Sequence, residues 1–252
     1  MNSPPPFIAL ADAHLRGLSD PRQQDMVEFL DTQRPKSSGL LLLGDFFDYL
    51  AGFNRAAALE YGPVLAELSR WPTLHIVEGN HDFDLPKTFP GFESSFIHPS
   101  LARLTVHGQG ILAFHGDRSN TKDHGTWCLR RVLQSAPLRF ARDVILPDAW
   151  VLGLAFYYAS RSRKRNQSTQ PEEVKAGREQ AIQALTQPSV RAVLYGHTHQ
   201  AHLERTAAGV IANPGPAVRG GSFLSILAQG IQLCRFPDGA VLAEAPWIEA
   251  IN

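Results

Sequence analysis

The nine residues Leu40–Asp48 constrain the fold more than any other stretch of the chain. They read LLLLGDFFD, in which four leucines precede Gly44 and two carboxylates, Asp45 and Asp48. A continuous apolar run is typical of a parallel strand that is covered on both faces, whereas a strand with one face in water alternates. Such strands carry functional side chains at their carboxyl ends, where the loops open to solvent. The sequence therefore predicts a buried parallel strand that ends at a site containing Asp45.

Four other apolar segments end in the same way, with ionisable or polar residues directly after them. They are Phe7–Ala11, Leu74–Val77, Ile111–Phe114 and Arg191–Tyr195. Helix-forming segments at 25–34 and 56–69 separate the first three strands. The order strand, helix, strand, helix, strand indicates a βαβαβ unit whose strand ends share one edge.

The rest of the chain divides into a helical part and a strand-rich part. Residues from about 120 to 187 are helix-prone, with a polar, basic loop expected at 160–169, and we interpret them as an inserted helical cap. Short segments separated by glycine and proline turns follow, and they predict antiparallel strands. With 252 residues, 44% of them hydrophobic, the chain is long enough for a single α/β domain spanning 1–252.

The residues that follow the five strands are all of metal-ligating type. They are Asp12 and His14, Asp45 and Asp48, Asn80 and His81, His115 and Asp117, and His197 and His199. One aspartate after a strand is usually a turn or cap residue. Five such events at one edge are not explained by packing, because uncompensated burial of these groups costs several kcal/mol. Oxygen and imidazole donors without a thiolate favour two divalent ions, Mn²⁺ first, with Fe²⁺ and Zn²⁺ as alternatives.

The bulk properties narrow the class of partner. The formal net charge is zero, so the chain lacks a global basic field and we expect no nucleic acid. We see no signal peptide, and no apolar run approaches the roughly 20 residues of a membrane span. Cys128 and Cys234 lie far apart in the sequence and fit a reducing compartment, although one disulfide stays open. We therefore expect a cytoplasmic protein.

The motifs D-x-H, GDxxD, GNHD, HGD and GHxH resemble those of the calcineurin-like metallophosphoesterases. All five are complete, and they extend from residue 12 to residue 199. The resemblance implies a four-layer sandwich of two mixed β-sheets flanked by helices. It also implies two metal sites that share one residue: Asp12, His14, Asp45 and His199 form the first, and Asp45, Asn80, His115 and His197 form the second.

The same resemblance assigns roles around the metals. His81 would be the imidazole that faces the substrate, with Asp48 as its orienting partner. Asp82 and Asp117 would either support the metal ligands from behind or be structural, and the turn Asn213–Gly215 would be structural. Two divalent ions with two ionised aspartates leave the site positive, so it attracts phosphate. The ions would acidify a water for in-line attack on phosphorus, and His81 would protonate the leaving oxygen or stabilise the transition state.

Substrate choice is expected to lie in the cap. Its segment 149–159 reads AWVLGLAFYYA, and a basic cluster at 161–165 follows at once. One interpretation is an apolar helix packed on the core, with a solvated basic loop after it. The other is a peripheral contact in which the apolar residues enter a membrane interface and the basic residues meet anionic head groups. The same pairing would hold acyl chains and a diphosphate.

The cap region also resembles the UDP-2,3-diacylglucosamine pyrophosphohydrolases of lipid A biosynthesis. The likeness rests on Asp123 after the HGD motif, on Trp127 and two arginines, and on the basic segment 160–167. Those enzymes cleave the diphosphate of a nucleotide-sugar lipid at the inner membrane surface. The resemblance implies that Asp123 contacts the sugar and that Ser160, Lys164 and Asn166 contact the substrate. The chain departs from the best-known members at His81, where they have the arginine of GNRDF.

Three functions therefore stay open. The first is a pyrophosphohydrolase of a lipid-linked nucleotide sugar, which works at the cytoplasmic face of the inner membrane. The second is a soluble phosphodiesterase or phosphatase that acts on nucleotides or phosphoproteins. The third is a non-catalytic protein-binding module on the same fold. Modules of this third kind typically lose ligands or the substrate-facing histidine, whereas this chain keeps all of them.

Overall fold

The computed structural model of the protein describes residues 3–119, 135–165 and 171–248, and within them the side chains outside 158–165. The helices and strands of these residues are β1 Phe7–Leu10, α1 Pro21–Gln33, η1 Arg34–Lys36, β2 Gly39–Leu42, β3 Leu50–Ala51, α2 Arg55–Glu60, α3 Gly62–Leu68, β4 Leu74–Val77, β5 Asp82–Phe83, β6 Phe96–His98, β7 Leu101–Val106, β8 Gln109–Phe114, α5 Ala136–Phe140, η2 Ala141–Ile145, α6 Asp148–Arg165, α7 Pro171–Leu185, β9 Ala192–Tyr195, β10 His202–Arg205, β11 Val210–Asn213, β12 Ser222–Leu227, β13 Gly230–Arg235 and β14 Val241–Pro246.

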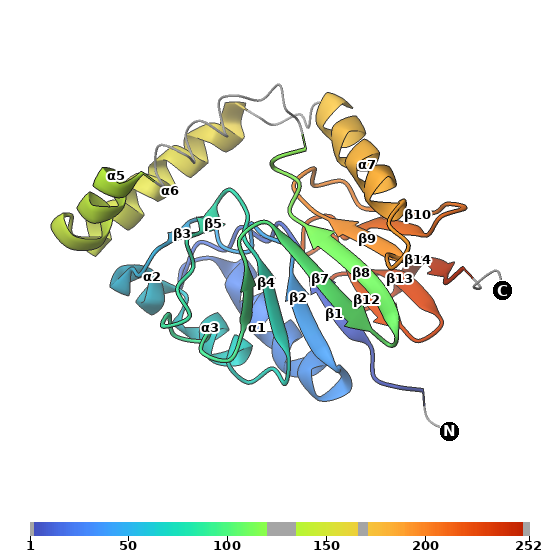
Figure 1. Ribbon diagram of the computed structural model, residues 1–252. Helices are drawn as coiled ribbons and strands as arrows, with labels where there is room; N and C mark the ends of the chain where they lie inside the picture. Colours follow the sequence, from blue (N-terminus) through green and yellow to red (C-terminus); the bar gives the residue numbers. More distant parts are fainter. Residues whose placement is uncertain (1–2, 120–134, 166–170, 249–252) are drawn as a thin grey trace.

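Two mixed sheets form the centre of the molecule (Figure 1). The seven-stranded sheet has the order β14-β13-β12-β1-β2-β4-β6, and the five-stranded sheet has the order β10-β11-β9-β8-β7. In the first sheet β1, β2, β4 and β6 are parallel, whereas β12, β13 and β14 add antiparallel strands. The expected parallel unit β1-α1-β2-α2-α3-β4 is therefore confirmed.

The apolar run of the central strands is explained by burial on both faces. In β2, Leu40 and Leu42 belong to the core on the helical side of the sheet, and Leu41 and Leu43 belong to the core between the two sheets. All four side chains are completely buried. Burying a leucine side chain contributes about 1.5–3 kcal/mol, so this strand alone anchors both cores.

Three apolar cores separate four layers. Helices α1 and α3 cover the outer face of the seven-stranded sheet, a second core fills the space between the sheets, and a third lies under α7 on the five-stranded sheet. Two mixed sheets flanked by helices are the architecture that the sequence predicts. Helix α7 falls inside the predicted cap boundary, and it packs on β9 through Ala181 and Leu185.

The helices of the parallel unit differ from the expected bounds at their ends. Helix α1 begins at Pro21, before the expected residue 25, because Asp20 caps it by accepting the N–H of Arg22 at 3.1 Å. The expected helix 56–69 is two helices, α2 and α3, which meet at Gly62 and Pro63. Proline lacks an N–H and favours the first turn of a new helix over an interior position.

The cap region contains helices α5 and α6 with a single π-helical turn, η2, between them. The expected loop at 160–169 is wrong for residues 160–165, because α6 continues to Arg165. Arginine and lysine are good helix formers, so a basic run does not end a helix. Among the described residues, no helix combines the length and the apolar character needed to cross a bilayer. The interpretation of 120–187 as an inserted cap stays a prediction.

Candidate metal centre

The carboxyl ends of five strands from both sheets meet at one place. Asp12 and His14 follow β1, Asp45 follows β2, His81 follows β4, His115 follows β8, and His197 and His199 follow β9. Their donor atoms form three overlapping groups within 4.8 Å: Asp12 with His14 and His199, His14 with Asp45 and His81, and Asp45 with His115 and His197. The structure therefore brings the predicted ligands together at the seam between the two sheets.

Asp45 lies between the groups. Its Oδ2 atom is 3.8 Å from His14 Nε2 and 3.4 Å from His115 Nε2, while Oδ1 accepts the main-chain N–H of His81 at 2.9 Å. The residue is buried. One carboxylate oxygen thus faces imidazoles on two sides, as a group shared by two cations would.

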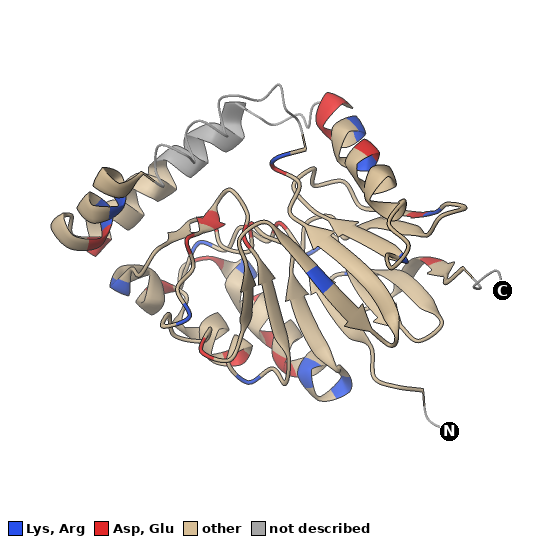
Figure 2. Cartoon of the chain, viewed as in Figure 1, with Lys and Arg blue, Asp and Glu red and all other residues tan. Residues whose placement is uncertain are grey.

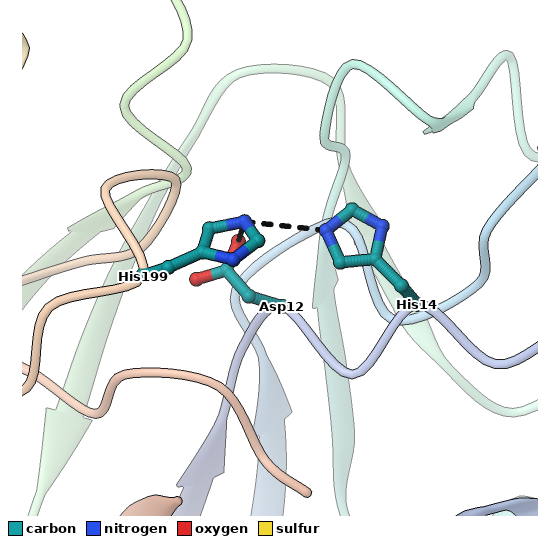
Figure 3. Close-up of side chains that lie close together, drawn as sticks. All are labelled: Asp12, His14 and His199. Atoms are coloured by element: carbon teal, nitrogen blue, oxygen red, sulfur yellow. Dashed lines mark hydrogen bonds and ion pairs between the residues drawn. The ribbon is translucent and has the colours of Figure 1, made fainter. Parts of the chain in front are cut away.

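The first group is drawn in Figure 3. His14 Nε2 and His199 Nε2 face each other at 3.3 Å, and Asp12 Oδ1 is 3.7 Å from His199 Nε2. Both oxygens of Asp12 accept the main-chain N–H of His197, at 3.1 and 3.0 Å. Two nitrogens bound at about 2.1 Å to one tetrahedral ion lie about 3.4 Å apart. The distance between the two Nε2 atoms is therefore the one expected for two ligands of one metal ion. The His199 side chain is 43% exposed, so this group is accessible to solvent.

The second group is held by His115. Its Nδ1 lies 2.8 Å from the carbonyl oxygen of Leu43, which only accepts, so Nδ1 carries the hydrogen. Nε2 therefore points toward the centre, where it is 3.2 Å from Asn80 Oδ1. The His197 ring lies edge-on to the His115 ring, with ring centroids 5.1 Å apart. These residues offer the carboxamide, imidazole and carboxylate donors that divalent transition metals bind.

The ionisable groups at the centre shift one another's pKa values. Burial alone would raise the pKa of Asp45, but His115 and His81 hold it well below its usual range. Burial works against protonation of His115, yet the attraction of Asp45 raises its pKa to about 10. Burial and the neighbouring His115 lower the pKa of His197. Asp45 is therefore kept ionised, and the field at its oxygens favours positive charge.

Asp82 fixes the loops that carry this centre. Its Oδ1 accepts the N–H groups of Asp45 at 2.8 Å and Gly79 at 2.9 Å, and its Oδ2 accepts those of Phe46 at 2.8 Å and Phe47 at 3.3 Å. The His115 ring also packs closely against this loop, and position 44 must be glycine for that reason, because a Cβ on Gly44 would lie 2.6 Å from His115 Nδ1. The sequence predicts no ligand role for Asp82. Its hydrogen bonds join the two loops that carry Asp45 and His81.

His81 and Asp48 are in contact through the Asp48 main chain. The His81 Nδ1 atom is 2.8 Å from the main-chain oxygen of Asp48. The Asp48 carboxylate lies 3.6 Å from His14 Nδ1 and 3.2 Å from Arg16 Nε. Burial opposes protonation of His81, but Asp45 and Asp48 raise its pKa. The imidazole of His81 is therefore oriented by a hydrogen bond that Nδ1 donates to a main-chain carbonyl, a group that any residue at position 48 would provide.

The remaining site predictions divide by position. Asp123 and Asn166 lie outside the described residues, whereas Ser160 and Lys164 lie in α6 with side chains outside the described set. Asn213, expected to be structural, braces the last ligand loop: its Nδ2 donates to the Gly196 oxygen and to Thr198 Oγ1, both at 3.0 Å. The NPG motif was the signal for this residue.

The cluster offers carboxylate, imidazole and carboxamide donors at the edge where the strands of both sheets end, as a centre for divalent metal ions requires. The calcineurin-like phosphoesterase family model matches residues 5–201, which is most of the chain. The chain belongs to this family, and the family resemblance expected from the five motifs is confirmed.

Known proteins extend the likeness beyond the motifs. UDP-2,3-diacylglucosamine hydrolase of Pectobacterium carotovorum is 27% identical over 91% of this chain and 98% of the relative. The protein of the same name from Edwardsiella ictaluri is 28% identical over 91% and 92%. Among solved structures, the phosphoesterase YfcE of E. coli has a TM-score of 0.51 and 16% identity, covering 96% of this chain and 98% of its own. That structural likeness supports the fold.

Proposed function

We propose that the protein is a dinuclear-metal hydrolase that cleaves the diphosphate of a UDP-sugar lipid resembling UDP-2,3-diacylglucosamine. The observation that carries the dinuclear part is the position of Asp45 Oδ2, 3.8 Å from His14 and 3.4 Å from His115. The substrate class is supported by relatives of that name, which this chain matches over 91% of its length.

Two divalent ions would be held by the predicted ligands. Asp12, His14, Asp45 and His199 would hold one, and Asp45, Asn80, His115 and His197 would hold the other. When bound, the ions would polarise the phosphoryl group and acidify a water. Mn²⁺ is our first choice, because the donors are oxygen and imidazole without a thiolate.

His81 is the proposed catalytic acid. Its Nδ1–H points at the Asp48 carbonyl, so Nε2 is the atom left for the substrate. Although burial opposes it, Asp45 and Asp48 raise the pKa of this imidazole above its usual value, which favours the protonated form that an acid needs. His81 would give that proton from Nε2 to the leaving phosphate oxygen, while Asp45 stays ionised at the centre.

The surface of the cap helices supports a lipid part in the substrate. Leu152 is buried in the core and Phe156 packs against it, so one face of α6 is held by the domain. On α5, η2 and α6 large apolar side chains also face solvent, among them Trp150 at 73% exposure and Val144 at 66%. An apolar patch of this kind is typical of a site that binds lipid or a membrane surface. We propose that it meets the acyl chains, at the cytoplasmic face of the inner membrane.

Hydrolysis of three substrates tests the proposal. The protein with Mn²⁺ is given UDP-2,3-diacylglucosamine in mixed micelles, UDP-N-acetylglucosamine, which lacks the fatty acyl chains, and an aryl phosphodiester. We expect the lipid substrate to have a kcat/KM at least about tenfold above that of the other two, since acyl contacts add binding energy.

The other functions give different results. Hydrolysis of the aryl diester without detergent dependence, and none of the lipid, would make the protein a soluble phosphodiesterase, as the histidine at position 81 would allow. No hydrolysis of any substrate, with both metals bound, would favour a protein-binding module.

A further inference from the structure

A cluster of ion pairs joins the cap helices to the loop that follows His81. The Asp84 carboxylate accepts hydrogen bonds from Nε of Arg139 at 2.9 Å and from Nη2 of the same side chain. Arg142 Nη1 lies 3.4 Å from Asp84 Oδ2. One carboxylate thus binds two guanidinium groups, of Arg139 in α5 and Arg142 in η2; Figure 2 shows basic and acidic positions side by side on this part of the ribbon.

Within the cluster the Asp84–Arg142 pair is shielded from water, whereas the Arg139 side chain is 47% exposed. The side chains of Asp84 and Arg142 are each 12% exposed. Arg142 also donates to Asp143 from Nε at 2.6 Å, and its guanidinium rests on Gly52, where a Cβ would lie 2.6 Å from Nη2. A fork of this kind, partly desolvated, is stronger than an isolated surface pair.

Asp84 is rigidly connected to the catalytic loop. It is three residues after His81, and the two residues before it form β5, which pairs with β3. Within β5, Asp82 binds the main-chain N–H of Asp45. Asp84 itself has φ of +54°, a conformation that aspartate and asparagine tolerate better than most residues. A displacement of Asp84 would therefore also displace the loop of His81, because only a short, hydrogen-bonded segment separates them.

The cap has a second attachment that leaves its outer face exposed. Asp148, at the start of α6, accepts the N–H of Arg55 at 2.7 Å, and Asn54 Nδ2 donates to the Asp148 carbonyl at 3.1 Å. This contact fixes the start of α6 to the start of α2. Together the two attachments determine how the cap helices are oriented relative to the rest of the domain, which one attachment alone would not do.

From these contacts we propose that Asp84, through Arg139 and Arg142, positions helices α5 and α6 beside the loop that carries His81 and so determines the preference for lipid-linked over small phosphoesters. The inference rests on the proposed function, because it names a determinant of that substrate preference. Asp84 is a positioning residue: it contacts the cap and not the reacting atoms.

The variant Asp84→Asn tests this with little other change, because asparagine keeps the size and tolerates the positive φ. We expect the ratio of kcat/KM for the lipid substrate to kcat/KM for the aryl diester to fall about tenfold, mainly through the KM of the lipid substrate. Arg142→Gln should lower the same ratio, and the double variant should lower it less than the product of the two effects. The matched control is Asp25→Asn, which breaks an exposed Asp25–Arg219 fork away from the cap.

Amide hydrogen exchange separates this inference from the proposed function. In Asp84→Asn the amides of 139–157 should exchange about tenfold faster than in the native protein, since a tertiary attachment is lost. If the native protein does not cleave the lipid but this exchange still rises, the proposed substrate is wrong and the attachment stands. An unchanged kcat/KM ratio, or unchanged exchange, in Asp84→Asn overturns the inference itself.

Discussion

Five residues of the centre have a backbone conformation that costs energy. The φ angles of Asp12, His14, Asp45, His197 and His199 lie between 45° and 67°. For residues other than glycine this left-handed region costs roughly 1–2 kcal/mol each. Strain repeated at three strand ends turns the side chains inward directly after each strand. Such a pattern is expected where the placement of side chains matters more than stability.

At the same scale, the roles of ligand and acid can be separated at His81. We predict that His81→Ala keeps both metal ions and lowers kcat about 10²- to 10⁴-fold, because it removes a proton donor. Metal content by mass spectrometry and kcat on the aryl diester provide the measurement. His81 also lies within 4.8 Å of His14 and Asp45 donor atoms, so loss of one ion in this variant would make it a ligand instead.

A second pair of histidines, away from the centre, predicts an acid-sensitive stability. Burial and the neighbouring His98 lower the pKa of His75 from 6.5 to about 4, and the two rings are hydrogen-bonded at 3.1 Å. Between these two pH values the unfolded chain holds more protons on His75 than the folded protein does. Stability is therefore present above pH 6.5 and is lost as the pH falls toward about 4.

We expect the melting temperature in EDTA to fall from pH 6.5 to pH 4.5, and to fall less steeply in His75→Phe, which keeps the ring stacking on Phe96. Thermal unfolding of both proteins in parallel measures this. The same slope in the variant as in the native protein would show that other groups carry the pH dependence.

Residue type and strand register were enough to predict which side chains gather at the centre. The sequence named Asp48 as the partner of His81, but it did not indicate which atom of Asp48 makes the contact, because a main-chain carbonyl leaves no mark on the sequence. The same holds for the contacts of Asp82, whose four donors are main-chain N–H groups, three in the loop after β2 and one, of Gly79, in the segment just before Asp82. A motif therefore identifies a residue whose side chain binds the main chain, but it does not indicate which main-chain groups that side chain binds.

At the scale of elements, the strands that were predicted are those with an apolar run. β4 was expected at its observed bounds, and β1, β2 and β9 within one residue at each end. β3 and β5 were missed, because two-residue strands are too short for a pattern. β6 was also missed: its Phe96 is exposed and it contains His98, so it lacks a buried run. Tertiary contacts alone specify such strands.

The short strand β5 allows a test of how loops are held. Asp82→Asn replaces one of two accepting oxygens by an NH₂ group, so two main-chain N–H groups lose their acceptor. We predict a loss of about 2–4 kcal/mol in the free energy of unfolding, because each buried unsatisfied group costs about 1–3 kcal/mol. Urea unfolding measures the change, and Asp31→Asn on the exposed face of α1 is the control. Native stability in Asp82→Asn would mean that the loops hold their shape without this brace.

At the scale of the whole molecule, the predicted ligands come from both sheets. Asp12, His14 and Asp45 follow strands of the seven-stranded sheet, whereas His115 and His197 follow strands of the five-stranded one. The sheets are otherwise joined here by apolar packing and by a few hydrogen bonds, such as those of His115 Nδ1 with the Leu43 carbonyl and of the His197 N–H with Asp12. Bound cations would therefore act as a cross-link at the open end of the sandwich, and they would stabilise the folded state by mass action.

Metal removal tests this coupling between centre and fold. With Mn²⁺ at about 100 times the Kd of each site, the native protein should gain about 2.7 kcal/mol per bound ion over the protein in EDTA, which is about 5.4 kcal/mol for two ions and is seen as a higher melting temperature in calorimetry. Asp45→Asn removes the charge shared by both groups, so it should bind less than one ion per chain and show almost no shift. His199→Ala, altered at the exposed rim of the first group, should keep one ion and part of the shift. Two ions retained in Asp45→Asn would contradict a carboxylate common to both sites, and equal melting temperatures of the native protein with Mn²⁺ and with EDTA would contradict the cross-link.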